Sequence, residues 1–350
     1  MSRAPRLGLA LDYARPAGPQ VEAVTRLDAA GLLDEVWVPE VYGADAPTVL
    51  GYLAARTERV TLAAGVLPVY SRSAALIAQT AESLDELSGG RALLGLGTSG
   101  PQVVEGLHGM PFAQPLAHLR ETVTVCRQAW RRERIGSVGG PRPVPLPPGR
   151  GTGQGKALRL IGRPRRDRIP IAIAALRPGA VELTAELAEG WFPIFYAPEA
   201  ADVWDAALER GWARRDPALG ELRLIVGMAT AIGDADETEA ARDDVRAELA
   251  LYVGGMGSRA QNFYAETVSR MGFADAAERI QSAFLAGDRE GAVAAVPDDL
   301  VAALSLVGDA EHVGARITAL RAAGVDTLVV RPAGVDPAVV VERLADLLAS

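Results

Sequence analysis

Three glycines near residue 100 form a motif that could bring backbone close to a ligand. Gly95, Gly97 and Gly100 have the G-x-G-x-x-G spacing of loops that approach a phosphate or a flat cofactor ring. A Rossmann fold also needs a second strand soon afterwards, ending in an acidic residue about 20 positions on. Residues 101–130 instead predict a short helix, a proline-bounded turn and a long amphipathic helix. We therefore expect a ring or phosphate to lie against a loop outside a Rossmann fold. The alternative is a glycine-lined strand end without a ligand.

Few other side chains have the types and spacing of a reactive group. His108 follows the glycine loop, and an imidazole is suited to donating a proton near neutral pH, although it could instead cap the short helix. His118 and His312 fall in helical patterns and do not form a metal-ligand spacing with it. The single cysteine, Cys126, lies on an apolar helical stripe and is expected to be a packed thiol. We expect no metal site.

Composition excludes several classes of partner. The chain of 350 residues is 49% hydrophobic and carries a formal charge of −8, which argues against general binding to nucleic acid or to anionic membranes. One cysteine excludes an internal disulfide framework. No run has the character of a signal peptide or the length of a membrane span. We expect a cytoplasmic protein that acts on a small-molecule substrate.

Eight short apolar runs alternate with amphipathic helical stretches along the chain. The runs are nearly continuous in hydrophobicity, as in parallel strands buried on both faces. They are residues 6–11, 34–39, 59–66, 92–97, 169–175, 190–195, 222–231 and 325–331. The predicted helices are 19–30, 46–57, 73–88, 115–133, 178–188, 198–214, 236–252, 309–323 and 336–348. This order predicts a single α/β domain over 1–350, a (β/α)8 TIM barrel with its active site where the strands end. Insertions are expected at 136–168, after strand four, and at 254–305, between strands seven and eight.

Several long motifs carry a family resemblance. They are "EVWVPEVYGADAPTVLGYLAARTERVTLAAGV" (35–66), "YSRSAALIAQTAESLDELSGGR" (70–91), "LDELSGGRALLGLGTSGPQVVEGLHGMPF" (84–112), "AELAEGWFPIFYAPE" (185–199) and "YVGGMGSRAQNFYAETVSRMGF" (252–273). In this order they resemble the luciferase-like monooxygenase superfamily, and within it the branch that uses the deazaflavin coenzyme F420, tetrahydromethanopterin reductase among them. The superfamily fold is a (β/α)8 barrel with insertions, in agreement with the strand count.

The resemblance implies a cofactor site at the carboxyl ends of the strands. A non-prolyl cis peptide at Gly65-Val66 would press against the ring, and Glu40 would lie at its hydroxyl edge. Two further loops would contact the ring and the phosphate, with residues Thr98, Ser99 and Gly100 in the first and Ala175, Leu176 and Arg177 in the second. Asp12, Tyr13 and Arg331 end the first and last strands and are candidates for substrate contacts.

The resemblance also implies the chemistry. Reduced F420 would deliver hydride from C5 to a C=C, C=N or C=O bond, and an acid would protonate the product. Candidates for that acid are Glu40, if burial keeps it protonated, then His108 and Tyr42. Relatives that oxidise sugar phosphates carry GTGE where this chain has GTSG at 97–100, so that activity is not expected.

Alternatives remain within the same fold. A two-component monooxygenase would use FMN and consume O2, whereas a deazaflavin does not activate O2. A barrel that binds a cofactor or partner without turnover is a second alternative. Residues 127–168 hold twelve Lys or Arg and only two acids. This excess of positive charge indicates either a solvated loop or a site that attracts the acidic tail of F420. Relatives are often dimers, so a homodimer is expected.

Overall fold

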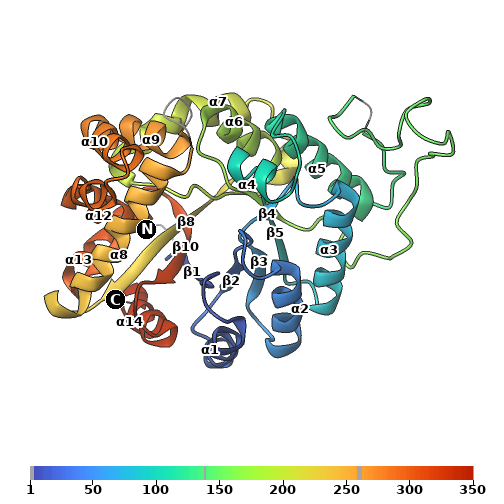
Figure 1. The fold of residues 1–350 in the computed structure, drawn as a ribbon. Helices are drawn as coiled ribbons and strands as arrows, with labels where there is room; N and C mark the ends of the chain where they lie inside the picture. Colours follow the sequence, from blue (N-terminus) through green and yellow to red (C-terminus); the bar gives the residue numbers. More distant parts are fainter. Residues whose placement is uncertain (1–3, 138, 258–261, 350) are drawn as a thin grey trace.

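Eight parallel strands close into a barrel in the computed structural model, which describes residues 4–137, 139–257 and 262–349 (Figure 1). Around the barrel the order is β1-β2-β3-β5-β6-β7-β8-β10, and β10 pairs with both β8 and β1. The barrel strands are β1 Arg6–Ala10, β2 Glu35–Val38, β3 Thr61–Ala64, β5 Ala92–Gly97, β6 Ile171–Ile173, β7 Gly190–Trp191, β8 Arg223–Ile232 and β10 Val325–Pro332. Each overlaps one of the eight predicted runs, with β8 and β10 ending one residue beyond theirs, so the predicted TIM barrel is confirmed.

Two additional strands extend the carboxyl end of the sheet. β4 (Leu67–Pro68) pairs with the end of β5, and β9 (Ser305–Gly308) pairs with the second half of β8. Neither was predicted. β4 is only two residues long, and β9 follows α12 (Asp298–Leu304) directly, with no glycine or proline between them to mark a boundary.

Helices surround the barrel and mostly match the predicted ranges. They are α1 Ala17–Ala30, α2 Ala46–Arg56, α3 Ala74–Leu87, α4 Pro101–Gly106, α5 Pro115–Trp130, α6 Pro178–Leu187, α7 Asp205–Trp212, α8 Ala235–Gly255, α9 Phe263–Val268, α10 Ala274–Leu285, α11 Arg289–Ala294, α13 Ala310–Ala322 and α14 Pro337–Ala349. Shorter turns are η1 Pro198–Trp204, η2 Pro217–Leu219 and η3 Ser269–Phe273. The predicted helix 198–214 is therefore two elements, with a non-helical break at Ala200 inside η1.

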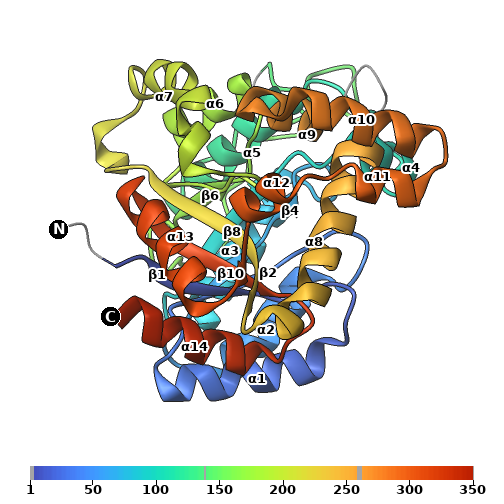
Figure 2. The ribbon, with the colours of Figure 1, turned by 90° about the vertical axis from the view of Figure 1, so that its left-hand side faces the viewer.

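The two insertions differ in character. Residues 136–137 and 139–168 run as a coil outside α3 and α5 (Figure 1). Residues 263–304 form α9 to α12, and Figure 2 shows α9, α10 and α11 at the same end of the molecule as α4. Because α4 follows the carboxyl end of β5, this second insertion covers the end of the barrel where an active site is expected. No helix in the described ranges is long and apolar enough to cross a membrane.

The barrel has an inner and an outer apolar layer. Alternate strand residues point inward and fill the interior, as the two-residue period of a strand requires. The inward cluster consists of Trp37, Ala63, Leu93, Ala172, Ile225 and Val329. The larger cluster lies between the strands and the helices. Burial on both faces explains why the strands appear in the sequence as nearly continuous apolar runs.

A polar network fills the amino end of the barrel. Glu35 is fully buried and pairs with Arg6 at 3.0 Å and with Arg223 at 2.6 Å. The indole of Trp37 also donates to Glu35 at 3.0 Å. These contacts occupy the charged groups at this end, so the candidate site is at the opposite, carboxyl end.

Candidate active site

The chain leaves β3 through a bulge that carries a cis peptide bond between Gly65 and Val66. The Gly65 N–H donates to the Val38 carbonyl at 2.8 Å, which keeps the bulge attached to β2. The chain then enters β4 beside the end of β5. The cis bond that the resemblance implied is present, and it places the partly exposed Val66 at the carboxyl end of the barrel.

The first two glycines of the G-x-G-x-x-G motif make room for this bulge. A Cβ at Gly95 would lie 1.9 Å from the Ala64 carbonyl oxygen and 3.0 Å from Val66 Cγ1. A Cβ at Gly97 would lie 2.7 Å from Val66 Cγ2. Gly100 differs, because no heavy atom beyond its chain neighbours lies within 4 Å of its Cβ position. The expectation that the glycines admit a ligand is therefore corrected for Gly95 and Gly97, which admit the neighbouring strand.

Glu40, after β2, is held by Arg72. Arg72 Nη2 donates to Glu40 Oε2 at 2.9 Å, Nη1 bonds Oε1, and the Ala46 N–H at the start of α2 donates to Oε2 at 3.1 Å. The guanidinium also bonds Asp45. The hydrogen bond to Glu40 raises the pKa of Arg72 although burial opposes this. Both Glu40 oxygens accept hydrogen bonds from the protein, so neither is placed to give a proton to a substrate. Tyr42, the third candidate acid, is 64% exposed.

The loop after β5 turns sharply before α4. Ser99 has a φ of +57°, and Thr98 Oγ1 donates to its carbonyl at 3.3 Å. α4 begins after Gly100, and His108 follows that helix with its N–H donating to Val103 at 3.3 Å. His108 Nε2 is enclosed and has no hydrogen-bond partner within the part of the chain that the structure describes. An enclosed nitrogen without a partner is unusual and marks a place where a ligand group could bond.

The predicted phosphate loop after β6 is held by two indoles. Trp191 Nε1 donates to the Ala175 carbonyl at 2.9 Å, and Trp204 Nε1 donates to the Leu176 carbonyl at 3.1 Å. Arg177 immediately precedes α6 and is exposed, with its guanidinium over a phenylalanine ring of α9 at 4.7 Å. The amino end of α6 carries partial positive charge, which is suited to an anion.

The predicted substrate residues do not offer free charges. Asp12 pairs with Arg15 at 3.1 Å. Arg331 donates to both oxygens of Glu248 in α8, at 2.8 and 3.0 Å. Tyr13 lies beside this pair and is 46% exposed; burial, and then the Glu248 carboxylate, raise the pKa of Tyr13. The structure thus brings Tyr13 and Arg331 together around Glu248, a residue that the sequence analysis did not identify.

A short part of the proline-rich segment also reaches the site. Glu121 of α5 accepts from Ser137 Oγ and from the Arg142 N–H, the latter at 3.1 Å. The Arg142 guanidinium donates to the carbonyls of Tyr70 at 3.3 Å and Arg72 at 3.4 Å. These contacts fix the chain that carries Arg72. The sequence analysis missed the contacts of the Arg142 guanidinium because they join residues that are 70 and 72 positions apart.

His118 provides a pH-dependent test of this packing. Its ring lies 4.6 Å from the Tyr70 ring, and burial, then the charge of Arg142, lower the pKa of His118 below its usual 6.5. As the pH falls through about 6.5, the unfolded chain therefore binds more protons than the folded chain does, and the free energy of unfolding decreases. In urea titrations we expect this loss to begin as the pH falls toward about 6.5 and to continue below it, and we expect the free energy of unfolding of His118→Phe to depend less steeply on pH. Identical slopes would show that His118 does not contribute.

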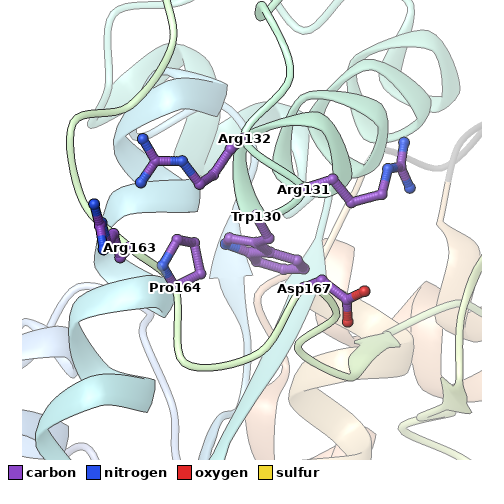
Figure 3. Close-up of a pocket in the computed structure, with 6 residues that line it drawn as sticks. All are labelled: Trp130, Arg131, Arg132, Arg163, Pro164 and Asp167. Carbon is purple, nitrogen blue, oxygen red and sulfur yellow. The ribbon is translucent and has the colours of Figure 1, made fainter.

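Four arginines of the basic segment 127–168 lie at the amino end of the barrel. Arg131, Arg132 and Arg163 line a hollow of about 510 Å³ around Trp130, at the carboxyl end of α5 (Figure 3). Arg166 bonds Asp85 and the start of β5. Because the chain turns there from α5 toward the beginning of β6, this is the amino end of the barrel. These arginines therefore do not support the hypothesis that the basic segment attracts the acidic tail of F420 at the carboxyl end of the barrel.

Comparison with known proteins places this barrel in a family. Residues 4–327 match the family described as luciferase-like monooxygenase. A protein of Mycobacterium tuberculosis named as a coenzyme F420-dependent oxidoreductase is 39% identical over 93% of this chain and 94% of its own. The 5,10-methylenetetrahydromethanopterin reductase of Archaeoglobus fulgidus is 26% identical over 89% and 88%.

A solved structure shows the same fold. The F420-dependent tetrahydromethanopterin reductase of Methanopyrus kandleri superposes with a TM-score of 0.76 at 23% identity, covering 97% of each chain. The closed barrel and its bulge therefore define a TIM-barrel protein of the luciferase-like type. The chain belongs to the luciferase-like monooxygenase family, and the resemblance found in the sequence is confirmed.

Proposed function

We propose that this chain is an F420-dependent oxidoreductase. It would transfer hydride between C5 of the deazaflavin and a C=C, C=N or C=O bond of a small organic substrate. The observation that carries the proposal is the 39% identity, over nearly the full length of both chains, to a relative named for coenzyme F420. The geometry of the carboxyl end adds support, because it offers a surface for a flat ring and donors for an anion.

The residues present fit such a cofactor. The partly exposed Val66 gives the bulge an apolar surface for a flat ring, with its two methyl groups packed against Gly95 and Gly97. The Cβ position of Gly100 faces open space. Arg177 and the amino end of α6 suit the phosphate groups. The loop with Thr98 and Ser99 follows β5, so around the barrel it lies between the bulge after β3 and the loop before α6. Glu40 takes a positioning role in this proposal, since it ties β2 to Arg72.

When bound, the cofactor supplies the hydride chemistry, and the chain orients it and provides a proton. His108 is the proposed proton donor, because its Nε2 is enclosed and without a protein partner in the described residues. We expect His108→Gln to lower kcat about 100-fold, at the lower end of what a general acid contributes, and to leave the Kd for F420 within about twofold. Steady-state kinetics and a fluorescence titration would measure both. An unchanged kcat would assign the role to Tyr42.

The rival function is an FMN-dependent monooxygenase, and the family description names monooxygenases. The two differ in their use of O2. We expect F420-dependent reduction of a carbonyl or enone substrate to proceed equally with and without air. Stoichiometric O2 uptake with reduced FMN would contradict the proposal, and binding of F420 without turnover of any acceptor would favour a barrel that only binds. A homodimer and a cytoplasmic location stay predictions.

A further inference from the structure

Three aromatic rings from the β7 loop and from two consecutive helices meet at the carboxyl end of the barrel. Phe195 follows β7, Tyr252 lies in α8 and Tyr264 in α9. Their ring centroids are 4.8 Å apart for the two tyrosines, and 6.0 and 5.8 Å from Phe195 to Tyr252 and Tyr264. Burial raises the pKa of Tyr264 to about 12, and it also raises the pKa of Tyr252, so both hydroxyls stay neutral at physiological pH.

This cluster faces the proposed cofactor surface across the barrel. The bulge with Val66 lies at β3 and β5, the third and fourth strands in the order around the barrel. α8 follows β8, the seventh strand, and Arg331 is the penultimate residue of β10, the eighth strand. In a closed barrel of eight strands these two pairs are on opposite sides. A substrate lying against a ring on the bulge would therefore have the aromatic cluster and the Arg331 region on its other side.

The charges on this side cancel within the protein. Glu248 meets the guanidinium of Arg331 through both oxygens, with side-chain exposures of 26% and 43%. Glu248 and Tyr252 are four residues apart in α8 and therefore lie on the same face of that helix, and, besides burial, the charge of Glu248 raises the pKa of Tyr13 and of Tyr252. The Glu248 carboxylate neutralises the charge of this guanidinium, which weakens its attraction for a second anion. Tyr13 and Tyr42, by contrast, remain 46% and 64% exposed.

Building on the F420-dependent function proposed above, we propose that the substrate is an uncharged, planar, conjugated carbonyl compound, and that Glu248 is a specificity residue. The rings of Tyr252 and Tyr13 hold the planar substrate, and Glu248 keeps Arg331 from selecting anions. Bound reduced deazaflavin would supply two electrons and one hydrogen, as hydride, to a carbon of the C=C or C=O bond, and would release its remaining ring proton to solvent. His108 would give a proton to the other atom of that bond and would be reprotonated from solvent.

Binding of matched probes tests this without turnover. The probes are 2-acetylnaphthalene and 6-acetyl-2-naphthoate, which differ by one carboxylate, titrated calorimetrically into protein loaded with oxidised F420. We expect the neutral ketone to bind the wild type at least about tenfold more tightly than the carboxylate. Glu248→Gln frees Arg331, so the carboxylate should gain about tenfold while the ketone changes by less than about twofold. Tyr252→Leu should weaken both probes about tenfold through lost ring contacts.

Controls separate the possible failures. Glu239→Gln changes an exposed carboxylate of the same helix, 3.5 Å from Arg242, and should leave both affinities unchanged. The double variant Glu248→Gln with Arg331→Met removes both charges and should keep the preference for the ketone even if the single variant is unstable. The Kd for F420 is measured in every variant. If the wild type does not bind F420, the cofactor proposal fails, and the substrate proposal is not the cause of that failure. Tighter wild-type binding of the carboxylate, or an unchanged preference in folded Glu248→Gln, would overturn the substrate class.

Discussion

Replacement of Gly95 by alanine is expected to lower the free energy of unfolding by about 3 kcal/mol, at the upper end of overpacking costs. The new Cβ would stand 1.9 Å from the Ala64 carbonyl oxygen, which is backbone and cannot be moved by a rotamer change. The bulge at Val66 would have to shift, so we also expect the Kd for F420 to rise at least about tenfold, or about 1.4 kcal/mol. Urea unfolding followed by tryptophan fluorescence, and a cofactor titration, measure the two effects.

Gly97 and Gly100 provide graded controls for this prediction. Gly97→Ala meets only a methyl group of Val66, at 2.7 Å, and should lower the free energy of unfolding by about 1–2 kcal/mol. Val66→Ala in the same chain removes that methyl group and should restore most of this loss, but it should not rescue Gly95→Ala. Gly100→Ala has open space and should stay within about 0.5 kcal/mol of wild type. Equal stabilities for all three alanine variants would refute the packing argument.

Loss of the Arg72 guanidinium should have an effect of similar size. Arg72→Met leaves the carboxylate of Glu40, only 11% exposed, without its cation and releases Asp45. Breaking one side of a largely buried pair lowers stability by about 3 kcal/mol. Because Glu40 also anchors the start of α2 beside the proposed ring edge, we expect the Kd for F420 to rise at least about tenfold. The same unfolding and titration experiments give both values.

A surface pair at the same end of the barrel is the matched control. Arg15 and Asp12 lie 3.1 Å apart with exposures of 61% and 46%, so Arg15→Met should change stability by less than about 0.5 kcal/mol. Arg72→Lys should recover only part of the loss, since an ammonium cannot bridge Glu40 and Asp45 as a guanidinium does. If Arg72→Met changes the free energy of unfolding and the Kd for F420 as little as Arg15→Met does, the contacts of Arg72 with Glu40 and Asp45 do not organise the site.

The barrel could be predicted from the sequence because its signal is local. Strands buried on both faces give short continuous apolar runs, and the helices between them have an apolar stripe of period 3.6. β9 was missed because its boundary with α12 contains no turn residue, and its position depends on pairing with the distant second half of β8. The break at Ala200 likewise has no distinctive residue in the sequence.

The site could be predicted only in part, for a physical reason. The position of the cis peptide followed from the family resemblance, and the structure has it at Gly65-Val66. The roles of Gly95 and Gly97 did not follow from their spacing, because what they accommodate is the neighbouring strand. Glu40 was read as an acid, but its partner Arg72 is 32 residues away and is brought to it by tertiary packing. Pairings of this kind are absent from a one-dimensional pattern.

The choice of cofactor is the central claim, and one measurement tests it most directly. Purified protein would be titrated in parallel with F420 and with FMN at equal ionic strength, with binding followed by the fluorescence of the cofactors. We predict saturable binding of F420 with a Kd at least about tenfold lower than that for FMN, a difference of about 1.4 kcal/mol. Tighter binding of FMN would contradict the account and favour an oxygen-consuming monooxygenase on the same barrel.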